Sequence, residues 1–330
     1  MNSIPVSDVL HNMHIVSLPM ITKFRNITVR ELALWEGPSG WAEFAAFTEY
    51  DDSNTLPWLQ AALEASHGPN ISPKQSFIPI NGTIPAVMPD DVEKIIKKFP
   101  GVTTFKIKVA QKGQTLSDDI ARIKAVRRLI PDATLRIDAN AAWTFTEAKE
   151  ALQTFKEFEL QYAEQPVRNL IDLKHLSELD IIPIAADEAI RLAEDSLEVI
   201  KKDAADVLVL KAAPLGGVIK VKQIASKTDK PIVISSALES SVGMHRGLLA
   251  ADYATTNWAC GLGTVSLFKH DICDDPLIPI NGKLDTEVRT PSFKLLEKYR
   301  VTSDNEKWWQ DRVARLLAIH NETITEHGTI

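Results

Sequence analysis

Cysteine is scarce in this chain, and the usual signals of secretion and membrane insertion are missing. Only Cys260 and Cys273 occur among the 330 residues. Secreted domains that depend on disulfides use more cysteines than this, so the composition favours a reduced compartment. The first basic residue is Lys23, so the start of the sequence lacks the positive segment of a signal peptide. No apolar run approaches the roughly 18 uninterrupted residues of a membrane helix. We therefore expect a soluble, cytoplasmic protein that does not bind membranes.

An excess of positive charge is absent as well. The chain has 37 Lys and Arg against 44 Asp and Glu, which gives a formal net charge of −7. Nucleic-acid-binding domains carry a basic surface, so we expect no nucleic-acid partner. Hydrophobic residues make up 45% and charged residues 25%, an ordinary globular composition, and the length allows one large and one smaller domain. The expected partner is a small-molecule substrate, and the sequence leaves both monomer and homo-oligomer open.

Residues 1–82 have the pattern of a small α+β unit. Two β-rich runs, residues 27–35 and 41–47, are separated by the turn signal Gly-Pro-Ser-Gly at residues 37–40. Residues 55–66 then show leucines at helical spacing. We expect a small α+β domain here; the resemblance given below implies that it is a capping domain.

After residue 82 the pattern changes to short apolar runs that alternate with amphipathic stretches. The runs end roughly 25 residues apart, the length of one strand, one helix and two short loops. Eight such runs predict an α/β fold of the TIM-like (β/α)8 type over residues 83–273. A doubly wound sheet is the rival, but its Gly-rich phosphate loop is missing after Val87, where Met-Pro-Asp-Asp follows. The expected strands are residues 83–87, 105–109, 134–139, 161–164, 182–187, 207–211, 232–236 and 257–260.

Helices are expected between these strands and again after the repeat stops. Residues 274–330 should pack back on this small N-terminal domain, with Trp308 and Trp309 in the contact. The expected helices are residues 117–130, 147–158, 192–202, 294–300 and 306–319.

Five of the expected strands end in charge, although strands of a parallel barrel are buried on both faces and should be apolar. The C-terminal ends of barrel strands form the active-site face. Because side chains alternate along a strand, charges two residues apart lie on the same face. A single charge at a strand end is usually just solvated, but five in succession, grouped by sign, indicate a site. The charged residues are Lys106, Lys108, Arg136, Asp138, Glu164, Asp187 and Lys211.

Three carboxylates that converge in one pocket would repel one another, and a divalent cation removes that conflict. All-oxygen ligands favour Mg²⁺, with Mn²⁺ as a possible substitute. Asp138, Glu164 and Asp187 are the candidate ligands, and lysines facing the metal would offer a general base and an electrostatic partner.

The remaining polar residues near these strand ends are less specific. Arg136 and Asn140 could each orient the metal ligands through hydrogen bonds, or simply form ordinary structural hydrogen bonds; the sequence leaves both roles open. Glu188 should point away from Asp187 and be structural. His175, His245 and His270 have no metal-binding spacing.

These strand ends are similar to those of the enolase superfamily. Residues 235–236 and Lys211 stand where the mandelate-racemase type places a His–Asp dyad, so the chain resembles the muconate-lactonizing subgroup, whose fold is a modified (β/α)7β barrel. Within it, residues 234–243 and 260–263 resemble the o-succinylbenzoate synthase family. Ala42 and Ala141 stand where that family has glycine, and Ala46 where it has proline. The motifs are Lys106-Ile107-Lys108, Arg136-Ile137-Asp138-Ala139-Asn140, Ala163-Glu164-Gln165-Pro166, Ala186-Asp187-Glu188 and Lys211-Ala212-Ala213-Pro214-Leu215-Gly216-Gly217.

The resemblance implies a Mg²⁺-dependent dehydration of 2-succinyl-6-hydroxy-2,4-cyclohexadiene-1-carboxylate in menaquinone biosynthesis. It implies that Lys108 removes a proton, that Lys106 lowers the basicity of Lys108, and that Lys211 faces the other side of the substrate. The residues implied in substrate binding are Ser235, Ser236, Gly261 and Gly263 around the succinyl carboxylate, and Met20 and Arg25 in a covering loop.

Two other functions remain open from the sequence. An N-succinylamino acid racemase or dipeptide epimerase needs one base on each face of its substrate, and the same two lysines would suffice. A catalytically silent barrel that serves as a binding module has no reason to keep five charged strand ends.

Overall fold

The computed structural model describes residues 3–24 and 27–327. Three antiparallel strands, in the order β1-β2-β3, form the N-terminal part: β1 (His14–Phe24), β2 (Ile27–Gly37) and β3 (Gly40–Phe44). The predicted hairpin is confirmed, and Gly40 at its turn has φ +123°, which favours glycine. β1 was not predicted, because Pro19 interrupts its pattern; the strand lies at the edge of this sheet, where proline is tolerated.

Two helices complete this part, which we call the capping unit: α1 (Val6–Leu10) and α2 (Asp52–His67). The α2 helix begins after Asp51, whose side chain accepts a hydrogen bond from the Asn54 amide and so satisfies one free N–H of the first turn. Its buried face includes Trp58, Leu59 and Leu63. The predicted helix 55–66 is therefore confirmed, with one additional turn at its start.

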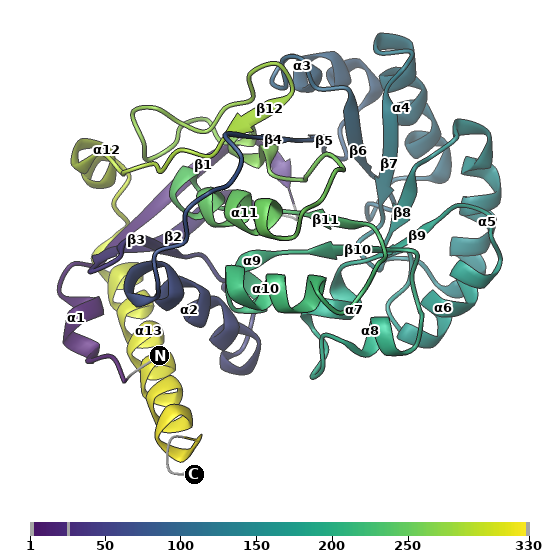
Figure 1. Cartoon of the computed structure of the whole chain (residues 1–330). Coiled ribbons are helices and arrows are strands. Elements are labelled where there is room, and N and C mark those ends of the chain that lie inside the picture. Colours follow the sequence, from purple (N-terminus) through teal and green to yellow (C-terminus); the bar gives the residue numbers. More distant parts are fainter. Residues whose placement is uncertain (1–2, 25–26, 328–330) are drawn as a thin grey trace.

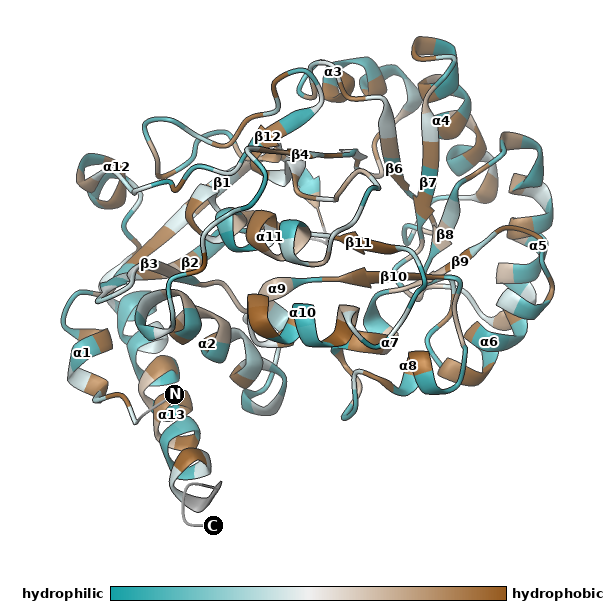
Figure 2. Cartoon of the chain, in the orientation of Figure 1, coloured by the Kyte–Doolittle hydropathy of each residue, from teal (hydrophilic) through white to brown (hydrophobic). Residues whose placement is uncertain are grey.

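The larger part is a parallel barrel of seven strands with an eighth segment that closes it (Figure 1). Each strand pairs with its neighbour in the sequence, and the first and last strands of the order are β5 and β11. Apolar residues dominate β10 and β11 in Figure 2, as expected for strands that are buried on both faces. The strands are β5 (Gly82–Ile84), β6 (Thr104–Lys108), β7 (Thr134–Asp138), β8 (Tyr162–Glu164), β9 (Ile184–Ala186), β10 (Val207–Leu210) and β11 (Ile232–Ile234).

The expected eighth strand, residues 257–260, is reduced to two bridges. The Cys260 amide donates to the Pro79 carbonyl at 2.8 Å, and the Gly261 amide donates to the Ile234 carbonyl at 2.7 Å. One short segment thus contacts the start of the sheet on one side and β11 on the other, which closes the barrel.

The helices that alternate with these strands match most of the predictions. The exception is residues 192–202, where only residues 198–201 are helical; a separate short helix ends before this range, at Arg191. The side chain of Asp195 accepts the Leu197 amide at 2.8 Å, a local hydrogen bond that competes with continuous helix. The helices are α3 (Val92–Ile96), α4 (Leu116–Leu129), α5 (Phe145–Phe155), α6 (Leu170–Glu178), α7 (Glu188–Arg191), α8 (Glu198–Lys201), α9 (Ala212–Leu215), α10 (Val218–Ala225) and α11 (Ser241–Tyr253), with 3-10 turns at Pro89–Asp91, Lys156–Phe158 and Gly263–Leu267.

The C-terminal segment returns to the capping unit. It contains β12 (Lys283–Asp285), which pairs with β4 (Phe77–Pro79), and the helices α12 (Phe293–Lys298) and α13 (Ser303–His327). Trp309 is fully buried and its indole N–H donates to Glu31 of β2 at 2.8 Å. Trp308 is 44% exposed, so of the two tryptophans predicted to pack here only Trp309 is buried.

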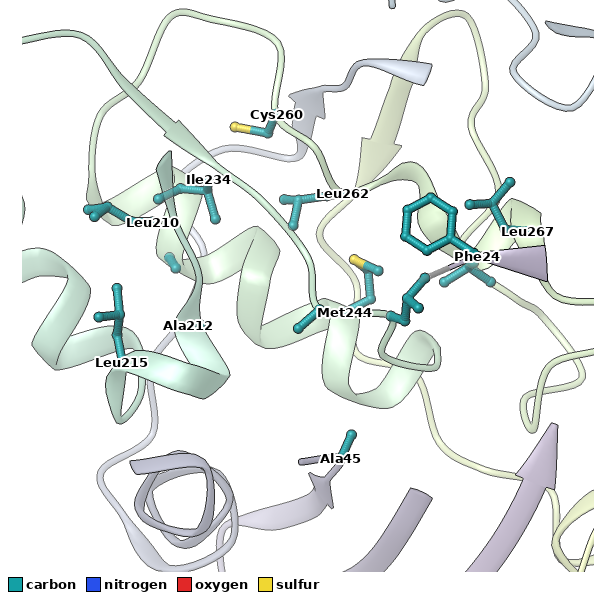
Figure 3. Close-up of a cluster of buried hydrophobic side chains, with 14 of the residues drawn as sticks. Phe24, Ala45, Leu210, Ala212, Leu215, Ile234, Met244, Cys260, Leu262 and Leu267 are labelled. Atoms are coloured by element: carbon teal, nitrogen blue, oxygen red, sulfur yellow. The ribbon is translucent and has the colours of Figure 1, made fainter. Parts of the chain in front are cut away.

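A single large cluster of buried apolar side chains joins the barrel to the capping unit. Figure 3 shows part of this cluster, in which Leu210 and Ile234 of the barrel strands lie in the same region as Met244 of α11 and Phe24 at the end of β1. No helix within residues 3–24 and 27–327 is long and apolar enough to cross a membrane.

Candidate active site

A cavity lies at the C-terminal ends of the barrel strands, beneath the capping unit. Four of the predicted charged residues and Asn140 line it. The capping unit contributes two phenylalanines, and the segment after β11 contributes a wall of small and polar residues. The lining residues used below are Lys106, Lys108, Asp138, Asn140, Lys211, Phe24, Phe47, Ser235, Ser236, Leu238, Gly261 and Thr264.

The two lysines of β6 bind the acids of the next two strands. Lys106 Nζ lies 2.7 Å from Glu164 Oε2 and 3.1 Å from Asp138 Oδ2. Lys108 Nζ lies 2.5 Å from Asp138 Oδ2 and donates to Asn140 Oδ1 at 2.6 Å. The β6–β7 register pairs Lys108 with Asp138, and the β7–β8 register pairs Asp138 with Glu164, so strand pairing alone brings these groups together.

Asp187 is the third predicted acid, and it follows β9. Lys211, which follows β10, forms an ion pair with Asp187 Oδ2, and Arg191 Nε lies 3.1 Å from Asp187 Oδ1. All three side chains are less than a tenth exposed. The structure therefore gathers the three predicted acids and the three predicted lysines at one end of the barrel.

Burial disfavours the charged form of each of these groups, and the charges of the neighbouring residues decide whether its pKa lies above or below the ordinary value. Burial raises the pKa of Glu164 to about 7, with Asp138 and Asp187 acting in the same direction against Lys106. Burial also favours neutral Asp138, but Lys108 and Lys106 hold its pKa well below the usual range. For Asp187, Lys211 and Arg191 outweigh burial and lower the pKa to about 2.

The two lysines of β6 differ from each other. Burial lowers the pKa of Lys108, and the like charge of Lys106 adds to this effect, against the opposite pull of Asp138. Burial acts on Lys106 too, but Glu164 and Asp138 hold its pKa well above the usual value. Lys106 is thus a permanent cation, and Lys108 is the better candidate for a proton acceptor.

The donor set fits a hard divalent cation. Asp138, Glu164 and Asp187 supply only oxygen, are almost fully buried, and repel one another, as the raised pKa of Glu164 shows. In the structure, lysine and arginine nitrogens bind these oxygens, and no three His, Cys, Asp or Glu side chains of the described residues are arranged as a ready metal site. A bound cation would have to displace the lysines from part of the carboxylate oxygens.

The predicted substrate-binding residues are only partly brought together. Ser235, Ser236 and Gly261 line the cavity, and a Cβ on Gly261 would lie 2.6 Å from Ser235 Oγ. Gly263 packs instead against Ile80 and is not part of the lining. Met20 is buried in a bridge to Phe268, also outside the lining, and Arg25 lies outside the described residues.

Arg136 belongs to the barrel interior rather than to the group of acids. Its guanidinium donates to Gln161 at 2.7 Å, to Asn81 at 2.9 Å and to the Ala259 carbonyl at 2.7 Å. It also lies over the ring of Tyr162. Of the two interpretations of Arg136, ordinary hydrogen bonding is the one that these contacts support.

The prediction that Glu188 faces away from the site is wrong. Its Oε1 accepts a hydrogen bond from Asn140 Nδ2 at 3.2 Å and lies 2.8 Å from Arg191 Nη2. β9 ends at Ala186 and α7 begins at Glu188, so the alternation of side chains along a strand no longer applies at this position.

Sequence reasoning also missed residues that shape the cavity from a distance. Arg30 of β2 is buried, and its guanidinium donates to the carbonyls of Leu238 at 3.2 Å and Ala45, and lies 4.1 Å from the Phe47 ring centre. Leu238 has φ +66°, a left-handed conformation that costs energy in a leucine. Arg30 thus joins two parts of the cavity wall, and nothing in the sequence distinguishes it from Glu31 and Glu36, the other charged residues of β2.

Comparison with known proteins agrees with this geometry. Residues 90–290 match the family described as enolase C-terminal domain-like, and residues 15–66 match the enolase N-terminal domain-like family. A muconate lactonizing enzyme from Pseudomonas fluorescens has the same fold, with a TM-score of 0.74 and 19% identity over 88% of this chain and 98% of that one. A barrel with acids and lysines at its strand ends, beneath such a cap, is the architecture of the enolase superfamily.

Two curated relatives narrow the class. A protein of Mycolicibacterium smegmatis is 46% identical over 96% of this chain and 99% of its own length, and one of Mycobacterium marinum is 46% identical over 93% of both. Both are named o-succinylbenzoate synthase. The chain belongs to the o-succinylbenzoate synthase family of that superfamily.

Proposed function

We propose that this protein is a carbon–oxygen lyase that dehydrates 2-succinyl-6-hydroxy-2,4-cyclohexadiene-1-carboxylate to 2-succinylbenzoate, a step of menaquinone biosynthesis. The observation that carries the proposal is that Lys108 and Lys211 line one cavity with Asp138, in a chain whose relatives bear that enzyme's name. The partner is therefore a small molecule. We also propose a cytoplasmic location, which agrees with two buried cysteines that form no disulfide.

Asp138, Glu164 and Asp187 would hold Mg²⁺, with Mn²⁺ as a substitute. The cation would supply positive charge that stabilises negative charge developing on the ring carboxylate of the substrate. Lys106, whose pKa is held well above the usual value, then remains as a cation beside Lys108. Its charge helps to keep Lys108 neutral and able to accept a proton.

Lys108 removes the proton from the carbon that bears the carboxylate. The electrons of that C–H bond form a ring double bond as the C–O bond to the neighbouring hydroxyl breaks. Protonated Lys108 returns its proton to the departing hydroxyl, so that water leaves and the ring becomes aromatic. Lys211 lies in the same cavity as a cation that stabilises negative charge spread over the ring.

The succinyl carboxylate is proposed to lie against Ser235, Ser236 and the Gly261 backbone. The Ser236 hydroxyl shares a 2.7 Å hydrogen bond with Thr264, which holds one polar wall of the cavity in place. Phe24 and Phe47 of the capping unit cover the cavity and exclude water.

Racemisation of N-succinylamino acids, or epimerisation of dipeptides, is the second candidate. It is favoured by one observation, that two lysines from different strands line the same cavity. A racemase needs a proton acceptor and a proton donor on opposite faces of one carbon, whereas the dehydration uses only Lys108 for proton transfer.

An ultraviolet assay for the aromatic product tests the proposal. Wild-type protein should form 2-succinylbenzoate with Mg²⁺ and lose this activity with EDTA. Lys211→Arg keeps the cation and should retain much of the dehydration while it abolishes racemisation. Lys174→Arg, an exposed lysine of α6, is the matched control and should match wild type in both assays. Efficient racemisation of N-succinylamino acids by a protein that leaves the cyclohexadiene untouched would overturn the proposal.

A further inference from the structure

Asn140 connects the proposed base to a carboxylate outside the cavity. Its side-chain oxygen accepts from Lys108 Nζ at 2.6 Å, and its side-chain nitrogen donates to Glu188 Oε1 at 3.2 Å. Asn140 itself has φ +46°, and its backbone amide donates to Asp138 Oδ1 at 3.0 Å, so the residue is held at both its main chain and its side chain.

The carboxylate of Glu188 decides which way the Asn140 amide points. An ionised carboxylate can only accept hydrogen bonds, so Asn140 must present its NH₂ group to Glu188. The amide oxygen is then left facing Lys108. If the amide were reversed, two oxygens would face each other at Glu188, and an NH₂ group would face the Lys108 amine.

Glu188 is held by Arg191 of its own helix, which in turn contacts Tyr50, between β3 and α2. Arg191 Nη2 lies 2.8 Å from Glu188 Oε1, and Arg191 Nη1 is 3.1 Å from the hydroxyl of Tyr50. The second oxygen, Glu188 Oε2, is buried and has no hydrogen-bond partner among the described residues. A carboxylate left half-paired in this way contributes little to stability, which favours a role in the site over a role in folding.

We propose that Glu188 is a positioning residue that acts through Asn140 to orient the amine of Lys108. This inference rests on the proposed function, in which Lys108 must be neutral when it accepts the proton. A neutral amine has two N–H groups and one lone pair. The Asn140 oxygen binds one N–H, so that the lone pair is turned away from Asn140 and is free to face the substrate.

A double-mutant cycle tests the inference because the polarity of the hydrogen bond can be reversed. In Glu188→Gln the amide at position 188 can donate as well as accept, so Asn140 is free to flip; kcat should fall about 10- to 100-fold with KM changed by less than about twofold. In Asn140→Asp two carboxylates oppose each other, and kcat should fall as well. In Asn140→Asp/Glu188→Gln the new carboxylate can accept both from the new amide at position 188 and from Lys108, and most of the lost kcat should return.

Two further measurements separate positioning from a structural or metal-related role. The Glu188→Gln protein should unfold at the wild-type denaturant midpoint, and the Mg²⁺ concentration for half-maximal activity should stay within about twofold of wild type. Glu178→Gln, an exposed glutamate of α6, is the matched control and should behave as wild type.

The inference is overturned if Glu188→Gln retains full kcat, if the double variant is as slow as or slower than the single variants, or if the loss is one of Mg²⁺ affinity alone. These outcomes all require an active wild-type protein. A wild-type protein that forms no aromatic product with Mg²⁺ would instead overturn the proposed function, so the two failures are distinguishable.

Discussion

His245 is a buried imidazole in α11 that takes no part in the site. Its Nε2 lies 3.2 Å from the Thr286 carbonyl oxygen and must carry the hydrogen that this carbonyl accepts. Burial lowers the pKa of His245 to about 4, and the positive charges of Arg246 and Arg289 act in the same direction, against Asp285 and the bond to Thr286.

His245 should make the protein less stable in mild acid. The unfolded chain binds a proton at the ordinary histidine pKa of 6.5 and the folded chain only near pH 4, so the contribution is present above pH 6.5 and is lost as the pH falls towards 4. The shift corresponds to about 3 kcal/mol in the free energy of unfolding. Urea unfolding at pH 7 and pH 4.5 measures it. His245→Gln should flatten this part of the pH profile, and the exposed His11→Gln should not; equal slopes in all three proteins would contradict the assignment.

At the residue scale, strand pairing explains why the predicted charged groups lie close together, while their roles stay predictions. Lys108, Asp138 and Glu164 end neighbouring strands, so parallel register alone brings them together. Glu188 was assigned the wrong orientation, because alternation holds only within a strand and the chain turns into α7 at that residue. The pKa of Lys106 is raised and that of Lys108 is lowered. This difference depends on contacts with carboxylates, which cannot be read from the sequence.

Glu64 shows how one element of the capping unit completes an element of the barrel. Its Oε2 accepts from the Val218 amide at 2.7 Å and its Oε1 from the Ile219 amide at 2.9 Å, so the α2 side chain caps the start of α10. Arg246 of α11 lies 2.7 Å from the same carboxylate. A Cβ on Gly217, which has φ +116°, would lie 2.5 Å from Glu64 Oε2, which explains the glycine at this position.

Removal of this cap should destabilise the protein. Glu64→Ala leaves two first-turn amides and Arg246 without their acceptor, and we expect the free energy of unfolding to fall by about 2–3 kcal/mol. Glu64→Gln keeps one oxygen acceptor and should lose roughly half as much. Denaturant unfolding measures both variants, and the exposed Glu150→Ala serves as the control. A Glu64→Ala protein with wild-type stability would show that water replaces the carboxylate at no cost.

At the element scale, the predictions failed where local chemistry competes with the apolar pattern. The β1 strand contains Pro19, and only residues 198–201 of the predicted helix 192–202 are helical, after the Asp195 side chain has accepted the Leu197 amide. The eighth strand is so short that it survives only as bridges at Cys260 and Gly261. The β1 strand was therefore missed altogether, whereas the eighth strand was predicted at the right position and only its length was wrong.

At the scale of the whole molecule, polar contacts between the capping unit and the barrel could not be read from the sequence. Arg30 and Leu238 are 208 residues apart, Glu43 and Ser240 are 197 apart, and Glu64 and Val218 are 154 apart. Composition and periodicity carry no information on such pairs, whereas the resemblance to a family predicted the cap and barrel together. The boundary at residue 82, with residues 274–330 assigned to the capping domain, stays a prediction.

The proposed metal should also be visible in the stability of the whole molecule. Asp138, Glu164 and Asp187 are paired with lysines and arginine in the structure, so Mg²⁺ must compete with Lys106, Lys108 and Lys211 for oxygens. A cation that binds only the folded chain raises the free energy of unfolding by about 2.7 kcal/mol at one hundred times its Kd. We therefore expect Tm to rise by a few degrees as Mg²⁺ is added, and to saturate.

The site should account for the whole of that rise. Glu164→Gln removes the acid whose pKa is raised by burial and by the other two carboxylates, and it should abolish the Mg²⁺-dependent part of Tm. Calorimetry with MgCl₂, and with NaCl at equal ionic strength, separates specific binding from screening of the net charge of −7. If the rise persists in Glu164→Gln, or if NaCl reproduces it in the wild type, the three acids do not hold the cation, and the charges at the strand ends serve only to bind one another.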